Sequence, residues 1–437
     1  MEAASTRTKT GTGENKPGVT SHSLNAKYKP RIGAAVNELF ALFLMRIHDD
    51  IPGCVVGQFS KLKHLIAPNF TAFREAYKGN VEKSFLVPAD TFDNVKGKFP
   101  IGFFVWRLGE RSTPTFTEGF ANASPSLMAV AVAEASDKSG LINGGVFTET
   151  TADVYDRKGE YVGTKTICAV SRDHVINTWL HGFFSKADDC VGWLRFVPND
   201  FQNNSGVYIT LKPNESDIQE SRVAAITKSN FAMIGMYLAI RNVVDATWLN
   251  DRDQFLYPND GWRGDQAFQS NCLIYALFHG QNRISSRDGV NHWIPFTEEE
   301  VGAKDCFKSH FMSDLINGRV ASNLNPANLV GNLSAHSAPL RLCVKDHLSS
   351  AATSVLDAGR ELWRYYHAQP GANPNASYYD IRLHFQGATT DAKGKAKMNA
   401  SSTDATYMRL LSDLRAAMKR LAKEIEPKVY EYGFLKR

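Results

Sequence analysis

The feature that most constrains the fold is the alternation of helical and strand-like apolar patterns between residues 30 and 108. In the helical segments, apolar side chains recur every three or four positions, as they do on the buried face of an amphipathic helix. In the other segments, short apolar runs are bounded by Pro or Gly, which is typical of strands. The predicted elements are a helix over residues 36–47, a buried parallel strand over 54–59, a helix over 68–79, and strands over 84–87 and 101–106.

This order of elements fits one half of an open α/β sheet. Further along the chain, a turn at 156–159 separates two short alternating segments and predicts a hairpin. Helical spacing returns over 230–248 and 268–279, and again in two helices beyond residue 345. The small polar residues of 387–403 predict a flexible loop. The sequence therefore predicts an α/β fold with a mixed central region and a helical C-terminal part.

Composition narrows the class of protein. A 43% hydrophobic and 22% charged chain is neither disordered nor fibrous, and a net charge of +5 permits a nucleic-acid partner without requiring one. The six cysteines are far apart, so no structural zinc site and no other metal site is predicted, and buried thiols in a reducing cytosol are expected. Because the sequence has neither a signal peptide nor an apolar run of membrane-spanning length, we expect a cytoplasmic protein with no membrane partner.

Four unusual strings carry a resemblance to a known family. They are FSKLKHLIAPNF at 59–70, FLVPADTFDNVKGKFPIGFFVW at 85–106, WLNDRDQFLYPN at 248–259 and FHGQNRI at 278–284. Together they resemble the adenine-specific DNA methyltransferases of bacterial restriction-modification systems, over the chain from about residue 30 to the C-terminus. The resemblance implies transfer of a methyl group from S-adenosylmethionine to the exocyclic amine of an adenine that has been turned out of the duplex.

The same resemblance gives Phe99 a role. In this class, an aromatic residue in a loop that leads into a strand stacks on one face of the extruded base, and Phe99 occupies that position. The chemistry suits the task, since a planar apolar ring gains dispersion energy with any base and Pro100 stiffens the backbone that presents it. The alternative is that Phe99 is simply the first core residue of the strand.

The chain departs from the family pattern at the catalytic loop. It contains neither an Asn-Pro-Pro-Tyr nor an Asp-Pro-Pro-Tyr string, and no early Gly-rich turn between a strand and a helix. We therefore expect no catalytic residue here and no binding of S-adenosylmethionine by this chain alone, which should be inactive by itself. The donor-binding N-terminal half of a methyltransferase, or a restriction subunit, is the expected protein partner. The alternative is a non-catalytic DNA-binding specificity subunit or a degenerate fragment.

Three groups of polar residues are candidates for contact with double-stranded DNA. They are Lys61, Lys63 and His64 after a strand end, Arg252 between two aspartates, and Gln281, Asn282 and Arg283 after an apolar helix. Each has a structural alternative. The lysines could form a solvated turn, Asp251 and Asp253 could pair locally with Arg252 or hold a magnesium ion, and Arg283 could complement the carbonyl end of a helix capped at Gly280.

These expectations divide the chain into four parts: a disordered arm at 1–29, a partial class-one methyltransferase lobe of Rossmann-like α/β type at 30–110, a mixed α/β target-recognition region at 111–340, and a helical C-terminal region at 341–437.

Overall fold

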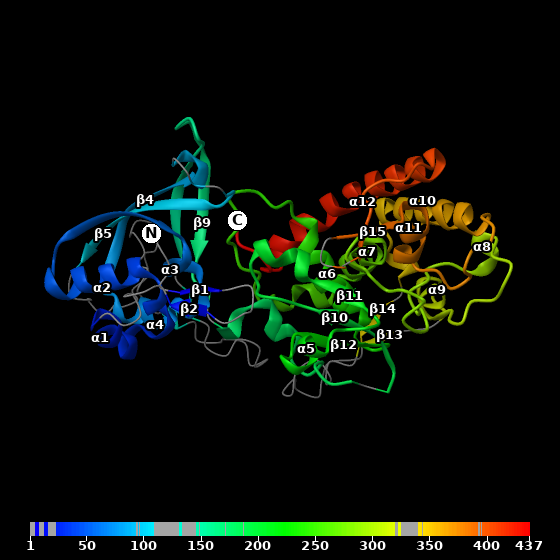
Figure 1. Cartoon of the computed structure of the whole chain (residues 1–437), viewed down its shortest axis with the longest axis horizontal. Helices are drawn as coiled ribbons and strands as arrows, with labels where there is room; N and C mark the ends of the chain where they lie inside the picture. Colours follow the sequence, from blue (N-terminus) through cyan, green and yellow to red (C-terminus); the bar gives the residue numbers. More distant parts are fainter. Residues whose placement is uncertain are drawn as a thin grey trace.

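The computed structural model contains two large hydrophobic cores, one formed by residues between 28 and 167 and one by residues between 176 and 435. Figure 1 shows the corresponding two parts side by side, with the C-terminus between them. The residues that the structure describes are 5–7, 13–15, 23–92, 95, 97–108, 131–132, 146–147, 149–170, 172–186, 188–319, 322–324, 340–342, 344–391, 394 and 396–437.

A five-stranded mixed sheet forms the first part. Its strands, in spatial order, are β3 (Val55–Lys61), β5 (Pro100–Leu108), β4 (Gly79–Pro88), β8 (Glu149–Tyr155) and β9 (Tyr161–Cys168). Strand β5 runs antiparallel to both of its neighbours, so β3 and β4 run in the same direction. Strands β4 and β8 pair in parallel, and β8 and β9 form an antiparallel hairpin.

One face of this sheet is covered by four helices: α1 (Ser23–Ile32), α2 (Leu39–Asp50), α3 (Lys63–Ile66) and α4 (Thr71–Ala76). Burial alternates along β5, as expected for a strand with one covered face. Phe104, Trp106 and Leu108 are buried against these helices, and the side chains between them are more exposed. On the opposite face, the rings of Phe59, Phe85 and Phe103 contact one another across three strands.

The predicted order of helix, strand, helix, strand, loop and strand over residues 30–108 is confirmed, and so is the α/β class. One strand was misjudged. Strand β3 is not a buried parallel strand, because it lies at the edge of the sheet and Val55 and Phe59 are exposed. The apolar run had the composition of a buried strand, but composition alone does not fix a strand's place in a sheet.

The boundaries of the parts also differ from those expected. The first sheet extends to Cys168 through the predicted hairpin, so residue 110 does not separate the two cores. At the N-terminal end, α1 begins at Ser23 and Tyr28 is fully buried, so order begins before residue 30. Within the arm expected at 1–29, the short strands β1 (Ser5–Arg7) and β2 (Gly13–Asn15) pair antiparallel, and its other residues before 23 lie outside the described residues.

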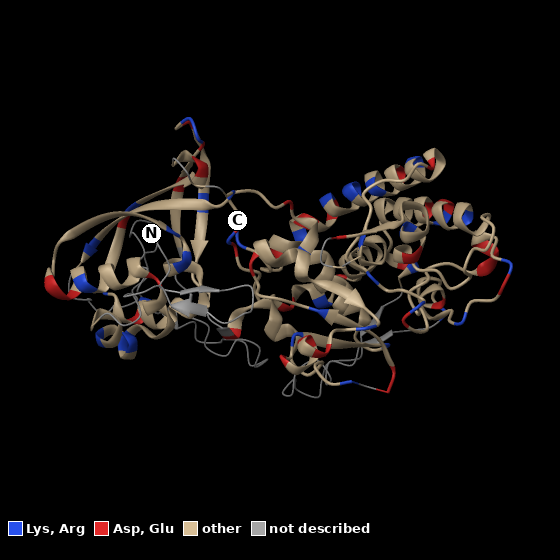
Figure 2. Cartoon of the chain, in the orientation of Figure 1, with Lys and Arg blue, Asp and Glu red and all other residues tan. Residues whose placement is uncertain are grey.

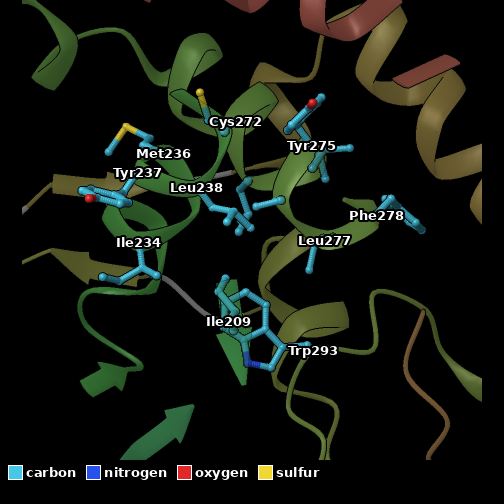
Figure 3. Packing of buried hydrophobic residues seen from close by; sticks show 14 of the residues in the cluster. Ile209, Ile234, Met236, Tyr237, Leu238, Cys272, Tyr275, Leu277, Phe278 and Trp293 are labelled. Atoms are coloured by element: carbon cyan, nitrogen blue, oxygen red, sulfur yellow. The ribbon is translucent and has the colours of Figure 1, made fainter. Parts of the chain in front are cut away.

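The second core is built around two apolar helices, α6 (Phe231–Val243) and α7 (Gln266–Phe278) (Figure 3). Every residue of α6 except Asn242 is buried, as expected for a helix that is apolar on all sides. The two helices approach closely at Gly235, where an added Cβ would lie 3.3 Å from the Cα of Leu273. They pack with a small antiparallel sheet of β11 (Tyr208–Thr210), β10 (Cys190–Arg195) and β12 (Val223–Thr227).

The C-terminal helices join this same core. Helices α10 (Ser350–His367) and α12 (Ala405–Glu431) are capped by Ser349 and Asp404, whose side chains accept backbone N–H groups of the first turn. Gly359 lets α10 approach α7, because a Cβ there would lie 2.3 Å from the ring of Phe278. The region after 341 is therefore helical as expected, but it shares a core with the central region.

Several shorter elements complete the described chain. They are helices α5 (Glu215–Gln219), α8 (Glu298–Val301), α9 (Phe311–Ile316) and α11 (Tyr378–Gln386), and the antiparallel strand pairs β6 (Ala131–Val132) with β7 (Val146–Phe147), β13 (Ser322–Leu324) with β14 (Leu340–Leu342), and β15 (Ala388–Thr390) with β16 (Ala396–Met398). The last pair forms a hairpin inside the segment predicted as a flexible loop. Among the helices described, none has the length and apolar character needed to cross a membrane.

The two parts meet at a buried ion pair. Lys165 of β9 lies 2.6 Å from Asp253 in the loop after α6, and both side chains are largely buried. Trp248 and Leu249 of the same loop pack against the first core, while the backbone N–H of Thr166 donates to the carbonyl of Arg437. The loop 248–259 and the C-terminal residue Arg437 are therefore segments of the second part that reach the sheet.

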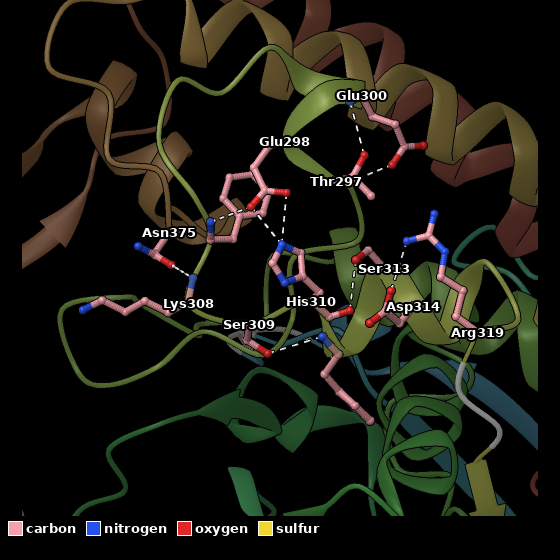
Figure 4. A network of polar contacts seen from close by, with 12 residues as sticks. Thr297, Glu298, Glu300, Lys308, Ser309, His310, Ser313, Asp314, Arg319 and Asn375 are labelled. Carbon is pink, nitrogen blue, oxygen red and sulfur yellow. Dashed lines mark hydrogen bonds and ion pairs between the residues drawn. The ribbon is translucent and has the colours of Figure 1, made fainter.

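A polar network orders the loop that follows α8 (Figure 4). Thr297 and Glu300 form a reciprocal capping box, in which each side chain accepts the other residue's backbone N–H. The carboxylate of Glu298 accepts hydrogen bonds from the backbone N–H of Phe307 at 2.7 Å and from Nε2 of His310 at 2.8 Å. The beginning of α8 thereby holds the loop in place.

Replacing Thr297 with alanine should lower the free energy of unfolding by about 1 kcal/mol, because it removes the side-chain cap of α8. Thr353→Ala is the control, since Thr353 is exposed within α10, where alanine favours the helix. Urea denaturation of both variants measures the difference. Equal stability of the two variants would contradict a capping role for Thr297.

Candidate functional site

The structure brings together three of the residues predicted for DNA recognition. The ammonium group of Lys61 lies 5.1 Å from the centroid of the Phe99 ring, and the guanidinium carbon of Arg252 lies 5.6 Å from it. These residues come from the end of β3, the residue before β5 and the loop 248–259. We call this group the Phe99 site. Cations at these distances interact favourably with an aromatic face.

The sheet fixes the position of Phe99. Its carbonyl accepts a hydrogen bond from the backbone N–H of Ala89 at 2.9 Å, and Pro100 pairs with Pro88 at the end of β4. Lys61 pairs with Ile101 at the end of β3. Because β3 and β4 are parallel, their carboxyl ends lie at the same edge of the sheet as Phe99, which is the edge where open α/β sheets bind ligands.

The Phe99 ring is only partly buried and belongs to none of the described hydrophobic clusters. It therefore is not an ordinary core residue at the start of β5. The ring covers Gly97, where an added Cβ would lie 2.6 Å from the ring carbon Cε1. A side chain at position 97 would displace the ring, so glycine allows the ring to lie where it does.

The basic residues around this ring differ in whether they form an ion pair. Lys61 makes no ion pair with any residue that the structure describes, and burial, with help from Lys63 and Arg252, lowers the pKa of its ammonium group. Lys63 pairs with Glu38 at 2.7 Å. Arg252 pairs with Asp251 at 3.0 Å and donates to the side-chain oxygen of Gln202. An anion near Phe99 would therefore find a partly desolvated lysine ready to bind it.

His64, predicted to contact DNA, is instead a core residue. It is 0% exposed and lies among the rings of Phe40, Phe104 and Trp106. Its Nδ1 atom donates to the carbonyl of Lys61 at 3.1 Å. It follows the strand end as predicted, but it is the second residue of the short helix α3 and is buried, so it is not available to DNA.

The residues Gln281, Asn282 and Arg283 lie on the second core. Asn282 is 4% exposed and donates to the carbonyls of Ala276 and Leu277 at the end of α7, which corrects its assignment as a DNA contact. Asn282 thus closes the carbonyl end of α7, whereas the structural alternative expected Gly280 as the cap and Arg283 at the carbonyls; the capping residue is His279.

Gln281 and Arg283 remain near the surface. Both side chains donate to the carbonyl of Ser205, and the guanidinium carbon of Arg283 lies 3.9 Å from the centroid of the Tyr208 ring. Arg195 also faces this ring, at 5.6 Å. Sequence reasoning missed Tyr208 and Arg195, and no pattern in the sequence would have placed them beside Arg283.

One short helical turn connects the two groups of candidate residues. The 3-10 helix Phe201–Gly206 carries Gln202, which accepts from Arg252, and Ser205, which accepts from Gln281 and Arg283. The Phe99 site and the Arg283–Tyr208 pair are therefore both bonded to the same element. Each presents an aromatic ring with cations over it, an arrangement that suits bases and phosphates of nucleic acid.

Among the residues described, no three His, Cys, Asp or Glu side chains are grouped as metal ligands would be, and Asp253 is engaged by Lys165. Burial raises the pKa of Asp253 to about 6 in spite of the opposing effect of Lys165. Of the two aspartates around Arg252, Asp253 thus pairs with Lys165 at the junction of the two parts, and Asp251 pairs with Arg252.

Comparison with known proteins gives no relative for this chain: no family model, no curated protein and no solved structure matches it.

Proposed function

We propose that the chain belongs to a bacterial DNA-modification system, as the part of an adenine-specific DNA methyltransferase that holds the target base. The observation that carries the proposal is the Phe99 site. A partly covered ring at the carboxyl ends of two parallel strands, with Lys61 and Arg252 over it, offers a stacking face and two positive charges. An extruded nucleotide needs both, because its base must stack and its phosphates must be neutralised.

The arrangement of the sheet is compatible with a partial class-one methyltransferase lobe. Strand β5 lies antiparallel between the parallel strands β3 and β4, with helices between β3 and β4 in the chain, as at one end of the sheet in that class. On this proposal, the remainder of such a sheet would continue from β3, which is the edge strand.

The described residues do not fit a site for S-adenosylmethionine. Such a site needs a Gly-rich turn from a strand into a helix. Strand β3 leads through Leu62 into the four-residue helix α3, and β12 leads into α6 through residues 228–230, without a glycine in either turn. On this proposal polypeptide outside residues 1–437 supplies the donor and the catalytic loop, and double-stranded DNA is the common partner.

A second candidate is a non-catalytic DNA-recognition subunit. The absence of an Asn-Pro-Pro-Tyr string favours it, because the Phe99 site could then hold a base without any methyl transfer. The two candidates differ in whether methylation follows when a donor-binding methyltransferase half is added. Both require DNA binding through the same ring and cations.

Replacing Phe99 with alanine should reduce the preference for an unpaired adenine by about tenfold, the expected loss of one base-stacking contact. Fluorescence anisotropy with two duplexes measures this, one fully paired and one carrying a single bulged adenine. Tyr161→Ala is the matched control, since Tyr161 is an exposed aromatic on β9, at the opposite edge of the sheet from β3.

The wild-type affinity for both duplexes should fall steeply as salt is raised, because binding releases counterions. The proposal fails if the Phe99→Ala variant keeps the full preference for the bulged duplex, or if the wild-type protein binds neither duplex.

A further inference from the structure

A cavity of about 470 Å³ lies away from the Phe99 site, between the end of α7 and helices α11 and α12. Its volume is in the usual range for a small-ligand pocket, roughly 300–1,000 Å³. Its lining combines four basic side chains, a pair of stacked rings and two carboxylates. We call it the α12 cavity, and nothing in the proposed function uses it.

Three of the basic residues form a row along α12. Arg415, Lys419 and Lys423 are four residues apart, so their side chains emerge on one face of the helix. Figure 2 shows Lys and Arg at intervals along this helix. None of the three makes an ion pair with a described residue, whereas Arg409 and Lys428 of the same helix pair with carboxylates at 3.2 and 3.0 Å. Arg420 of the same helix is also without an ion pair to a described residue but does not line the cavity, so what distinguishes Arg415, Lys419 and Lys423 is that they face the cavity together.

The fourth basic residue, Arg382 of α11, is partly buried. Its guanidinium carbon lies 5.4 Å from the centroid of the Tyr378 ring, and its Nε has no hydrogen-bond partner within the described chain. Its Nη1 lies beside Gly280, where an added Cβ would be only 3.3 Å away. Because Arg382 lines the cavity, its guanidinium is placed to form a charge-assisted hydrogen bond with an anion there.

Flat rings line the wall at the end of α7. Tyr275 and His279 stack with their centroids 5.2 Å apart and an angle of 21° between the ring planes. Burial, together with the nearby Arg382, lowers the pKa of His279 to about 4, so the imidazole is neutral at physiological pH. The carboxylates of Asp245 and Glu426 also line the cavity and can accept hydrogen bonds from hydroxyl or amino groups.

We infer that the α12 cavity binds a nucleotide unit, with its phosphate on Arg382 and the basic row of α12 and its sugar and base toward the rings of Tyr275 and His279 and the carboxylates of Asp245 and Glu426. A bare inorganic anion would use the cations but not the rings. The same nucleotide unit could come from a free mononucleotide or from a nucleic-acid strand, and the two sources can be separated by experiment.

The test is titration calorimetry of the full chain with AMP and with an eight-residue oligodeoxyadenylate. Lys419→Glu should weaken binding of the preferred probe about tenfold or more, because it replaces a phosphate-binding cation with a repelling anion. Arg420→Glu is the matched control, since Arg420 is the adjacent exposed residue of α12, carries the same charge and does not line the cavity. It should change the affinity less than twofold.

Binding of AMP that Lys419→Glu weakens supports a free nucleotide as the ligand, and binding of the oligonucleotide alone with the same sensitivity supports a strand. The inference is overturned if neither probe binds, or if the two variants weaken binding equally. Both substitutions are at exposed positions, so thermal melting of each variant should match the wild type and exclude unfolding as the cause.

Discussion

Replacing Arg241 with leucine should lower the free energy of unfolding by about 3 kcal/mol or more. Arg241 is 0% exposed in the apolar helix α6, and it forms no ion pair with a described carboxylate. Its guanidinium donates to the side-chain oxygen of Asn204, to the hydroxyl of Tyr237 and to the carbonyls of Pro198 and Asp200, at 2.9 to 3.3 Å. Leucine would remove these four hydrogen bonds from the interior, and of the two backbone carbonyls that of Asp200 would keep one other donor, the backbone N–H of Asn203 at 3.3 Å.

The effect should extend to the proposed DNA surface. Asn204 belongs to the 3-10 helix Phe201–Gly206, which also carries the partners of Arg252 and Arg283. The guanidinium carbon of Arg241 also lies 4.7 Å from the ring centroid of Phe255, in the loop that bears Arg252. The buried arginine therefore ties both groups of candidate residues to the second core, and its loss should weaken DNA binding as well as stability.

Urea denaturation of the Arg241→Leu and Arg222→Leu variants compares their free energies of unfolding. Arg222 undergoes the same chemical change on the surface, where its ion pair is with exposed Glu220, so its replacement should alter stability by less than about 0.5 kcal/mol. If Arg241→Leu unfolds at the same urea concentration as Arg222→Leu, the network around Arg241 does not stabilise the fold in the way described.

Local sequence patterns predicted the helices and strands, but not which strands pair with one another. Helices α2, α7 and α12 follow from apolar spacing, and the hairpin of β8 and β9 follows from its turn, because these signals lie within a few neighbouring residues. The parallel pairing of β4 with β8 joins segments separated by the whole of residues 89–148. No local signal reports such a pairing, so the expected boundary at 110 was placed inside one sheet.

In the candidate site, too, the sequence indicated individual residues but not which of them lie together. Lys61, Phe99 and Arg252 were each singled out from their own surroundings, but only the fold brings them to one ring. His64 and Asn282 had similar sequence contexts and proved to be buried, since a polar residue after a strand or helix looks alike whether it faces solvent or the core. Arg241 did carry a signal, because a lone arginine in an apolar helix must find buried acceptors.

Acidification should destabilise the protein through His64. Burial, with help from the guanidinium of Arg74, lowers the pKa of His64 to about 3, against an ordinary value of 6.5 in the unfolded chain. Below pH 6.5 the unfolded chain therefore binds a proton that the folded chain does not, and the free energy of unfolding falls as the pH falls toward 3. Between pH 6.5 and 4 this single group should remove about 3 kcal/mol.

The variant His64→Phe isolates this contribution. Phenylalanine suits the surrounding rings of Phe40, Phe104 and Trp106 but loses the hydrogen bond to the carbonyl of Lys61, so at pH 7 to 9 it should be less stable than the wild type by about 1 kcal/mol, constant across that range. Below pH 6.5 the difference should shrink and then reverse, because only the wild type can gain a proton at position 64 on unfolding. Urea denaturation at a series of pH values measures both curves. Parallel curves down to pH 4 would mean that His64 is not held neutral in the fold.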